Sequence, residues 1–403
     1  MIGEVTREIY MNRLVKTIAT TLLAILTALS IGSNSYAANA SQSIATGIDV
    51  SKYNGAVNWG AVAGSGVRYA FIRVGNPQTG LDPQFAANMR NAAAAGVKTG
   101  VYYYSHATSV EAATLEAMQT LNWINGYTVN YPVVYDVEAG GQRSLSAAQL
   151  QAIVNTYCSI IDAAGYYPVV YSYKSLMKSK LSGVPWDKWV AQYSGNLDYG
   201  GAAFWQYTNK GRLPGIGSNV DMNYQFKNYD QLIVANGFVP HNGQMRFYLN
   251  YKKQTGWINL GGIKYHMDQL GNLQTGWFID TDGKMYYLTP GDGHAAIGIQ
   301  TIDGVTYLFD INGVRCSGFT NIGDVTFYND PLTGALQTGW FITPDGNTYY
   351  ADSTGAVAKG VYVIKDVIYY FNEKGALVRN GSVTIDGLKF VTTEDGIILP
   401  VTP

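Results

Sequence analysis

The sequence has little charge and few cysteines. Only 14% of its 403 residues are charged and the formal net charge is −1, so the chain has no basic surface of the kind that binds nucleic acid. Cys158 and Cys316 are the only cysteines and fall in different parts of the chain, which excludes a disulfide framework. Because Cys158 lies on an apolar helical stripe, we expect a buried thiol there.

Histidines are also few, and they do not have the spacing of metal ligands. They are His106, His241, His266 and His294. We therefore expect no metal and no other cofactor. Tyrosine (32) and glycine (46) are abundant instead. A bias towards Tyr, Asn and Gly is typical of a carbohydrate-binding or wall-binding surface, where flat rings meet sugar faces and short polar groups meet hydroxyls.

Residues 1–40 are predicted to be a secretory signal and leader. Basic residues precede an apolar run at 18–31, and small residues follow it. Cleavage after Ala37 or Ala40 fits the small-x-small rule, and the run is too short for a comfortable membrane span. No later segment competes with it, so we expect an exported protein with no membrane span after cleavage.

Residues 41–232 alternate strand and helix patterns. Five strand–helix units are followed by three strands joined only by loops. Eight strands is the number whose closure makes a barrel filled by side chains. The pattern therefore predicts an α/β fold, an incomplete TIM-like barrel that lacks its last helices. The strands are expected at residues 47–51, 69–74, 99–105, 132–138, 168–173, 188–193, 202–207 and 220–226, and the helices at 59–63, 82–96, 110–125, 146–165 and 176–181.

The fourth predicted strand ends in two carboxylates, Asp136 and Glu138. Side chains two residues apart leave a strand on the same side, with Cα atoms roughly 6.6 Å apart. Two carboxylates held that close raise the cost of each other's ionisation. One can then stay protonated while the other remains an anion, as cleavage of a glycosidic bond requires. The alternative is a pair of solvated acids at a strand end.

Two further acids are expected at the same end of the barrel, where reactive residues of such folds gather. Asp49 lies on the first predicted strand and Asp221 begins the eighth. Because these strands are neighbours in a closed barrel, Asp49 and Asp221 should lie close together. Their alternative role is structural hydrogen bonding.

These acids belong to motifs that recur in a fixed order along the chain. The motifs are Gly47-Ile48-Asp49-Val50-Ser51 with Asn54-Gly55, Asp136-Val137-Glu138, Trp189-Val190-Ala191-Gln192-Tyr193, Trp205-Gln206-Tyr207 and Val220-Asp221-Met222-Asn223. Over roughly residues 44–230 the chain resembles glycoside hydrolase family 25, the N-acetylmuramidases. The resemblance implies the barrel described above and cleavage of the β-1,4 bond between N-acetylmuramic acid and N-acetylglucosamine in peptidoglycan.

The resemblance also implies a role for each acid. Glu138 would be the general acid, and its pKa would be raised by three nearby carboxylates. Asp136 would assist the other face of the sugar, as nucleophile or by orienting the substrate's acetamido group. Asp49 and Asp221 would be supporting acids of the cleft.

Side chains that stack on or hydrogen bond to sugars would line the groove. They are Tyr103, Tyr104, Tyr171, Gln192, Tyr193 and Trp205. The alternative is barrel core, and since strand residues alternate we expect half of them to be only that. The chain departs from the family pattern after the second strand, at residues 73–76, and at the end of the third, at residues 102–105. Both departures affect substrate contacts and neither touches the acids.

Residues 233–403 change to strand patterns punctuated by glycine. Glycines recur 20 to 22 residues apart, with a predicted hairpin between each pair. They are Gly256, Gly276, Gly298, Gly318, Gly339, Gly360 and Gly381. A fixed period of this size predicts an all-β hairpin-repeat solenoid in which no unit is stable alone.

The array resembles cell-wall-binding repeats of the choline-binding and glucan-binding type. In the choline-binding version, aromatic rings of adjacent repeats hold a quaternary ammonium through cation–π contacts. Tryptophan follows the repeat glycine only at Trp257, Trp277 and Trp340, so we do not expect a full set of choline cages. The resemblance implies attachment to a wall polymer, either teichoic-acid choline or glucan. The alternative is that these rings pack one hairpin on the next.

The sequence as a whole predicts a secreted N-acetylmuramidase that acts on peptidoglycan glycan strands and is anchored to the wall by its repeats. Two alternatives stay open. One is a wall-anchored glycosidase on another β-linked polymer such as chitin, since carboxylate pairs on barrels serve many sugars. The other is a wall-binding adhesin with an inactive barrel.

Overall fold

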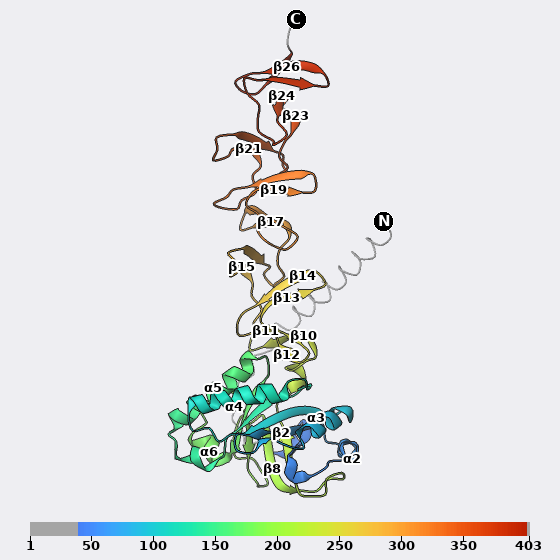
Figure 1. Ribbon diagram of the computed structural model, residues 1–403, viewed down its shortest axis with the longest axis vertical. Helices are drawn as coiled ribbons and strands as arrows, with labels where there is room; N and C mark the ends of the chain where they lie inside the picture. The colour runs from blue at the N-terminus through green and yellow to red at the C-terminus, as the bar shows by residue number, and fades with distance from the viewer. Residues whose placement is uncertain (1–38, 401–403) are drawn as a thin grey trace. The chain divides into compact units, whose positions relative to one another are not determined.

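The computed structural model describes residues 39–400, which divide into two compact units (Figure 1). The first unit comprises residues 39–258 and 267–273, and the second comprises residues 259–266 and 274–400. The predicted signal and leader, residues 1–40, lies almost wholly outside the described residues. Across residues 39–400, no helix has both the length and the apolar character needed to cross a membrane.

A closed barrel forms the body of the first unit. Strand β1 pairs with β2 on one side and with β9 on the other, which closes the sheet. The strands from β1 to β8 run parallel, except for the short β3, and β9 runs antiparallel to both of its neighbours. The barrel strands in the described residues are β1 (Ala45–Val50), β2 (Tyr69–Asn76), β4 (Lys98–Tyr104), β5 (Val133–Asp136), β6 (Pro168–Tyr173), β7 (Asp187–Ala191), β8 (Phe204–Gly211) and β9 (Val220–Gln225), with β3 (Gly80–Leu81) added to β2. The predicted incomplete TIM-like barrel is confirmed.

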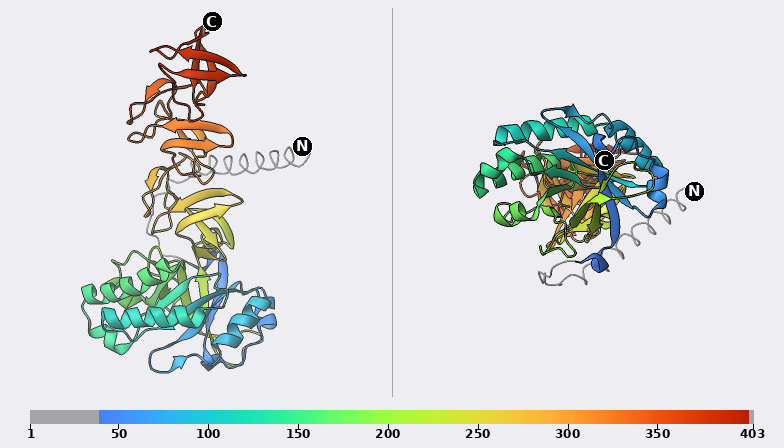
Figure 2. Two further views of the ribbon diagram at one scale, coloured as in Figure 1. Left: turned by 45° about the horizontal axis from the view of Figure 1, so that its top comes forward. Right: turned by 90° about the horizontal axis from the view of Figure 1, so that it is seen from below.

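Helices follow the early strands and pack against the outer face of the sheet (Figure 2). They are α2 (Trp59–Gly64), α3 (Phe85–Ala94), α4 (Val110–Ile124), α5 (Ala147–Ala163) and α6 (Lys174–Ser179), with short 3-10 turns η1 (Ala40–Gln42), η2 (Lys52–Asn54), η3 (Gly140–Ser144) and η4 (Tyr229–Gln231). The predicted capping box of α5 is present, since Ser146 and Gln149 exchange side-chain to backbone hydrogen bonds. Cys158 is a free, buried thiol on α5, as predicted.

Helix α3 begins later than its predicted start at Asp82. The Asp82 carboxylate instead accepts hydrogen bonds from the backbone nitrogens of Lys52 (3.0 Å) and Gln84 (2.9 Å). It therefore holds the loop before the helix against the turn that follows β1.

Strand alternation divides the first unit into two packed layers. Residues that point outward pack against the helices, and residues that point inward fill the barrel. Inward glycines make room for large rings, because a Cβ at Gly47 would lie 2.2 Å from the Tyr69 ring and one at Gly100 would lie 2.6 Å from the Phe71 ring. Aromatic rings therefore fill the interior, and polar residues such as Arg73, two positions after Phe71, come next towards the strands' carboxyl ends.

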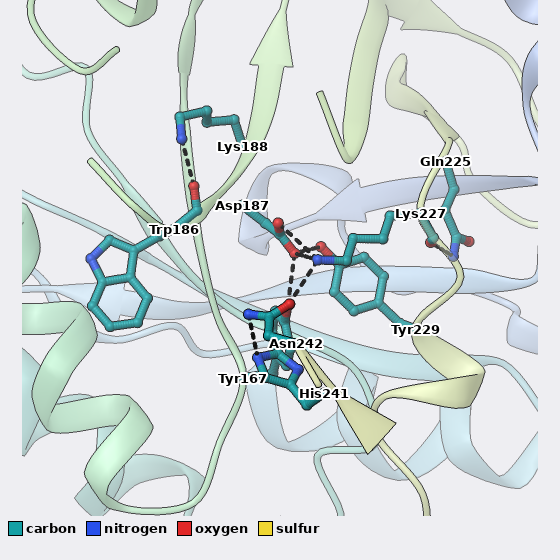
Figure 3. A network of polar contacts seen from close by, with 9 residues as sticks. All are labelled: Tyr167, Trp186, Asp187, Lys188, Gln225, Lys227, Tyr229, His241 and Asn242. Atoms are coloured by element: carbon teal, nitrogen blue, oxygen red, sulfur yellow. Dashed lines mark hydrogen bonds and ion pairs between the residues drawn. The ribbon is translucent and has the colours of Figure 1, made fainter. Parts of the chain in front are cut away.

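A polar network closes the amino-terminal end of the barrel (Figure 3). The Asp187 carboxylate accepts hydrogen bonds from Lys227 Nζ (2.7 Å), from the Tyr229 hydroxyl (2.7 Å) and from the Tyr167 hydroxyl (3.0 Å). The Tyr229 ring stacks on Phe204 with ring centroids 5.0 Å apart. This end is therefore filled by side chains.

A three-stranded sheet extends the first unit beyond residue 232, where the sequence predicts the domain boundary. It consists of β10 (Asn236–His241), β11 (Gln244–Leu249) and β12 (Lys252–Lys253). The Lys253 side chain is 2% exposed, its Nζ lies 2.7 Å from Asp162 Oδ2, and its backbone nitrogen donates to Gly165 O. These contacts attach the three-stranded sheet to the barrel. The predicted domain division into 41–232 and 233–403 stays a prediction.

Antiparallel hairpins make up the second unit and confirm the predicted repeats. Gly276, Gly298 and Gly339, which open hairpins, have φ of 83°, 68° and 73°, a conformation that favours glycine. An Asx turn recurs after each of several hairpins: Asp310 Oδ1, for example, accepts from the backbone nitrogens of Asn312 and Val314. The remaining strands are β13 (Gly256–Leu260), β14 (Ile263–Met267), β15 (Gly276–Ile279), β16 (Met285–Leu288), β17 (Gly298–Ile302), β18 (Val305–Phe309), β19 (Gly318–Ile322), β20 (Val325–Asn329), β21 (Gly339–Ile342), β22 (Thr348–Ala351), β23 (Gly360–Ile364), β24 (Val367–Phe371), β25 (Ser382–Ile385), β26 (Leu388–Thr392) and β27 (Ile398–Pro400).

Candidate active site

Asp136 and Glu138 lie at the carboxyl end of β5 and both line one cleft. The strand ends at Asp136, and the next residues stay extended because Val137 N donates to Tyr171 O (2.9 Å) and Ser172 Oγ donates to Val137 O (2.6 Å). Val137 is fully buried in the outer layer. Its neighbours on either side therefore point into the cleft, as the spacing predicts.

Asp49 and Asp221 are direct cross-strand partners on β1 and β9. Because β9 is antiparallel, its first residues lie at the end of the barrel where the parallel strands finish. Asp49 Oδ2 accepts hydrogen bonds from Asn223 Nδ2 (2.8 Å) and Gln206 Nε2 (3.0 Å). The structure thus brings together all four acids that the sequence singles out.

The cleft has a volume of about 870 Å³ and is lined by polar and aromatic side chains. Its lining includes Asp49, Ser51, Tyr53, Asn54, Arg73, Asn76, Gln78, Thr79, Tyr102, Tyr104, His106, Asp136, Glu138, Tyr171, Trp189, Tyr193, Gln206, Asn209, Ser218, Asn219 and Asp221. A groove of this size and polarity fits several linked sugar rings better than an apolar ligand.

Burial raises the pKa of each of the four carboxyl groups. For Asp136 the charges of Glu138 and Asp49 add to the effect of burial, and the Arg73 guanidinium opposes it, so that its pKa stays well above the usual range. Burial is also the largest cause of the raised pKa of Asp49, and the charge of Asp221 adds to it.

For Glu138 the direction agrees with the expectation but the cause differs. Burial is the main reason that its pKa is raised, and the charge of Asp221 contributes. The guanidinium groups of Arg143 and Arg73 lower the pKa of Glu138. We expected three neighbouring carboxylates to raise the pKa of Glu138. That cause is wrong, because burial is the largest effect and two cations oppose the rise.

Three of the predicted groove residues line the cleft: Tyr104, Tyr171 and Tyr193. The Tyr171 hydroxyl donates to Gln206 Oε1 (2.9 Å), and the Tyr193 hydroxyl donates to the same oxygen (2.8 Å). Gln206 in turn donates to Asp49. The two tyrosines are thus connected to the buried acids.

The prediction is wrong for Tyr103, Trp205 and Gln192, which do not line the cleft. Tyr103 is fully buried, points out of the barrel and donates to Gln119 Oε1 (2.6 Å). Trp205 is 1% exposed in the outer layer, and its indole nitrogen donates to Gln192 O (2.7 Å). The Gln192 amide is used within its own loop, where Oε1 accepts from Asp198 N (3.0 Å). Tyr103 and Trp205 each lie between two inward-pointing residues of their strand. Because successive side chains of a strand alternate, these two point outward.

Several cleft residues are missing from the sequence-based prediction, above all Arg73, Tyr102 and Gln206. The Arg73 guanidinium lies 5.1 Å from the centroid of the Tyr104 ring. The sequence signal that could identify them is the two-residue alternation of side chains along a strand. Arg73 is two residues after the inward Phe71, and Gln206 is two residues after the inward Phe204.

In the second unit, aromatic rings pack one hairpin on the next. Trp277 contacts Tyr287 of its own hairpin (ring centroids 5.1 Å apart) and Tyr307 of the following hairpin (4.9 Å). The arrangement recurs at Trp340, which remains 44% exposed while Trp277 remains 41% exposed. Each ring therefore both packs and presents a face to solvent. Trp257, on β13 at the end of the first unit, is half-buried.

Comparison with known proteins places the barrel in a family. The model of glycosyl hydrolases family 25 matches residues 48–216. The uncharacterized protein YegX of Escherichia coli O157:H7 is 33% identical over 193 residues, which make up 44% of this chain and 68% of that protein. The chain belongs to glycosyl hydrolase family 25. It is therefore a glycoside hydrolase, and the family resemblance seen in the order of its motifs is confirmed.

Two further proteins each match 44% of the chain. The autolytic lysozyme of Clostridium acetobutylicum is 29% identical over 181 residues, covering 44% of this chain and 54% of that protein. The modular autolysin LytC of Streptococcus pneumoniae has a solved structure that is 30% identical, covers 44% of this chain and 46% of that chain, and gives a TM-score of 0.41. The chain thus spans about half the length of these two proteins. A cell wall binding repeat model matches residues 255–273 and 338–357.

Proposed function

We propose that this family 25 chain is a secreted N-acetylmuramidase. It hydrolyses the β-1,4 bond between N-acetylmuramic acid and N-acetylglucosamine in peptidoglycan. The observation that carries the proposal is the pair Glu138 and Asp136, side by side in a cleft of about 870 Å³ at the barrel mouth. Its relatives include the autolytic lysozyme and the lysozyme M1 of Streptomyces globisporus, which supports peptidoglycan as the substrate.

In this proposal Glu138 is the general acid. Burial raises its pKa, which keeps the carboxyl group protonated at a higher pH than usual and ready to donate to the glycosidic oxygen. As the bond to the leaving sugar breaks, that oxygen takes the proton from Glu138. The resulting carboxylate then acts as the base that removes a proton from the incoming water.

Asp136 acts on the other face of the sugar, as nucleophile or by orienting the substrate's acetamido group. Its Oδ1 is buried and has no hydrogen-bond partner among the described residues. A buried acceptor without a donor is costly, and an acetamido N–H would satisfy it. This favours the orienting role, in which the acetamido oxygen attacks the anomeric carbon.

Asp49 and Asp221 support these two residues from β1 and β9. They add negative charge to the cleft, which stabilises the positive charge that develops on the sugar in the transition state. Tyr104, Tyr171 and Tyr193 supply ring faces and hydroxyls for the sugars.

The repeats hold the enzyme on its substrate by binding a wall polymer, either teichoic-acid choline or glucan. The match of a cell wall binding repeat model to two segments supports this assignment. The half-exposed Trp277 and Trp340 are the proposed contacts, with Trp257 as a third. Attachment raises the local concentration of glycan strands without changing the chemistry.

The first prediction tests the acid directly. Glu138→Gln removes the proton donor while keeping the shape of the side chain, so it should abolish glycan cleavage and leave wall binding intact. Mass spectrometry of muropeptides released from purified peptidoglycan by wild type and variant measures the outcome, and chitin is the parallel substrate. Release from chitin alone would establish the other glycosidase, and absence of release by the wild type would establish a binding protein. Full activity in Glu138→Gln would remove Glu138 as the acid.

A further inference from the structure

A carboxylate outside the cleft lies behind the ends of β4 and β5. Glu116, on α4, is 3% exposed. Its Oε2 accepts hydrogen bonds from the Tyr135 hydroxyl (2.6 Å) and from Ser105 Oγ (2.8 Å), and its Oε1 accepts from His106 N (2.9 Å). A buried charge is costly unless it is well paired, and these three donors come from residues next to the proposed active site.

A second set of hydrogen bonds connects Glu116 to the loop that carries Glu138. Gln142 is fully buried in η3, and its Nε2 donates to Ser105 Oγ (2.8 Å). Its Oε1 accepts from Ala139 N (3.1 Å). The path therefore runs from Glu116 through Ser105 and Gln142 to the residue that follows Glu138.

Each end of this network is one residue away from a residue of the cleft. Tyr135 precedes Asp136, Ala139 follows Glu138, and Ser105 lies between Tyr104 and His106, which both line the cleft. Strand parity explains the arrangement. Residues that point into the cleft alternate with residues that point outward to α4 and α5, so a group on α4 can hold the backbone of the site without entering it.

We propose that Glu116 is a positioning residue that fixes Asp136 and Glu138 through Tyr135 and through the Ser105–Gln142 path. The proposal rests on the function proposed above. Misplacing a reacting group by about 1 Å can cost roughly a hundredfold in rate. The loop after β5 is also held by the hydrogen bonds of Val137 and by Lys180 Nζ, which donates to Arg143 O and Leu145 O. The backbone nitrogen of Ala139, next to Glu138, donates its hydrogen bond to Gln142 Oε1.

The chemistry of the network requires a carboxylate at position 116. A carboxylate only accepts hydrogen bonds, and here it receives three. Ser105 Oγ already accepts from Gln142 Nε2 and from Ala107 N (3.1 Å). An amide in place of the carboxylate would direct an N–H donor at this oxygen or at His106 N, so Glu116→Gln reverses the polarity at nearly constant shape.

The test compares Glu116→Gln and Gln142→Ala with wild type on purified peptidoglycan, in the full chain. We expect kcat per folded molecule to fall about ten- to a hundredfold in Glu116→Gln, with KM within about twofold, because substrate contacts are unchanged. Gln142→Ala should lower kcat in the same way. Since both act through one path, the double variant should lose little more than the worse single variant.

A matched control separates positioning from folding. Asn88 on α3 is 2% exposed and accepts a hydrogen bond from Trp59 Nε1 (3.1 Å), and neither residue lines the cleft. Asn88→Ala should lower Tm and leave kcat per folded molecule unchanged. Wild-type kcat in a folded Glu116→Gln with lowered Tm would overturn the proposal. If Glu116→Gln does not fold, wild-type kcat in Gln142→Ala overturns it. Failure of the proposed function is distinct, since it appears as activity in Glu138→Gln.

Discussion

At the scale of single residues, Asp136 combines a reactive position with a cost in stability. Asp136 is only 4% exposed. Its pKa is raised well above the usual range, mainly by burial and then by the charges of Glu138 and Asp49. The folded protein therefore binds this proton more tightly than the unfolded chain does. The stability that the group contributes is present below its unfolded pKa and is lost as the pH rises through its folded pKa.

We therefore expect Asp136→Asn to raise Tm at neutral pH while removing glycan cleavage. The gain should disappear near pH 3, where the carboxyl group is protonated in both states. Each ~1 kcal/mol gained corresponds to about 2–4 °C in Tm for a domain of 150–250 residues. Thermal unfolding followed between about pH 3 and 8 measures the effect. A lower Tm than wild type at neutral pH would contradict it.

Asp198 supplies the control for this experiment. It is exposed, and hydrogen bonds from Lys178 and Lys174 lower its pKa. The linkage therefore has the opposite sign, and Asp198→Asn should not raise Tm at neutral pH. Because the pair is solvent-exposed, the change should be small.

The acids could be predicted from the sequence, while their supports could not. Asp136 and Glu138 follow a buried strand directly, so local spacing is enough to place them on one side. Tyr102, Tyr103 and Tyr104 form an unbroken aromatic run, in which no alternation of polarity tells inward from outward. Glu116 is one of two acids on α4, with Glu111, and its role depends on strand ends that only the fold brings to it.

At the scale of elements, strand number and closure could be predicted because each strand is a short apolar run bounded by turn residues. The exact ends of helices and strands could not be predicted, because they depend on tertiary hydrogen bonds. Helix α3 begins at Phe85, because the Asp82 carboxylate before it accepts a hydrogen bond from Lys52 N in the turn after the neighbouring strand β1. Likewise the sheet β10–β12 has the composition of the repeats, yet it packs on the barrel.

The contacts of Lys253 predict the shortest stable form of the barrel unit. A fragment of residues 41–258 keeps the ion pair with Asp162, whereas a fragment of residues 41–232 leaves that carboxylate without its partner. Breaking a buried pair costs about 3–5 kcal/mol, and less here because Asp162 is 23% exposed. We expect the longer fragment to unfold at the higher denaturant concentration.

Lys253→Ala in the longer fragment is the matched variant. It should reproduce much of the loss while keeping the sheet β10–β12 present. Equal denaturation midpoints for the two fragments would show that the barrel is complete at residue 232, as the predicted domain boundary has it.

At the scale of the whole molecule, the barrel supplies all the residues of the cleft and the repeats supply none. The cleft is lined entirely by residues between Asp49 and Asp221. The repeat period could be predicted from glycine spacing, because the hairpins that open with β13, β15, β17, β19, β21 and β23 each begin with a glycine at positive φ. The ligand of the repeats could not be predicted, because the same tryptophans that face solvent also pack on the next hairpin.

Removing residues 259–400 should therefore separate attachment from catalysis. On soluble glycan fragments, kcat/KM should stay within about twofold of the full chain, because no cleft residue is lost. On intact walls the rate should fall by roughly 10²-fold or more, because attachment works through effective concentration. The full chain with Trp277→Ala and Trp340→Ala is the companion variant, since it keeps the hairpins while removing the half-exposed rings. If those rings bind the wall polymer, this variant should lose most of its activity on walls and none on soluble fragments, as measured by released reducing sugar. If they only pack, its Tm should fall while sedimentation with walls stays at the wild-type level.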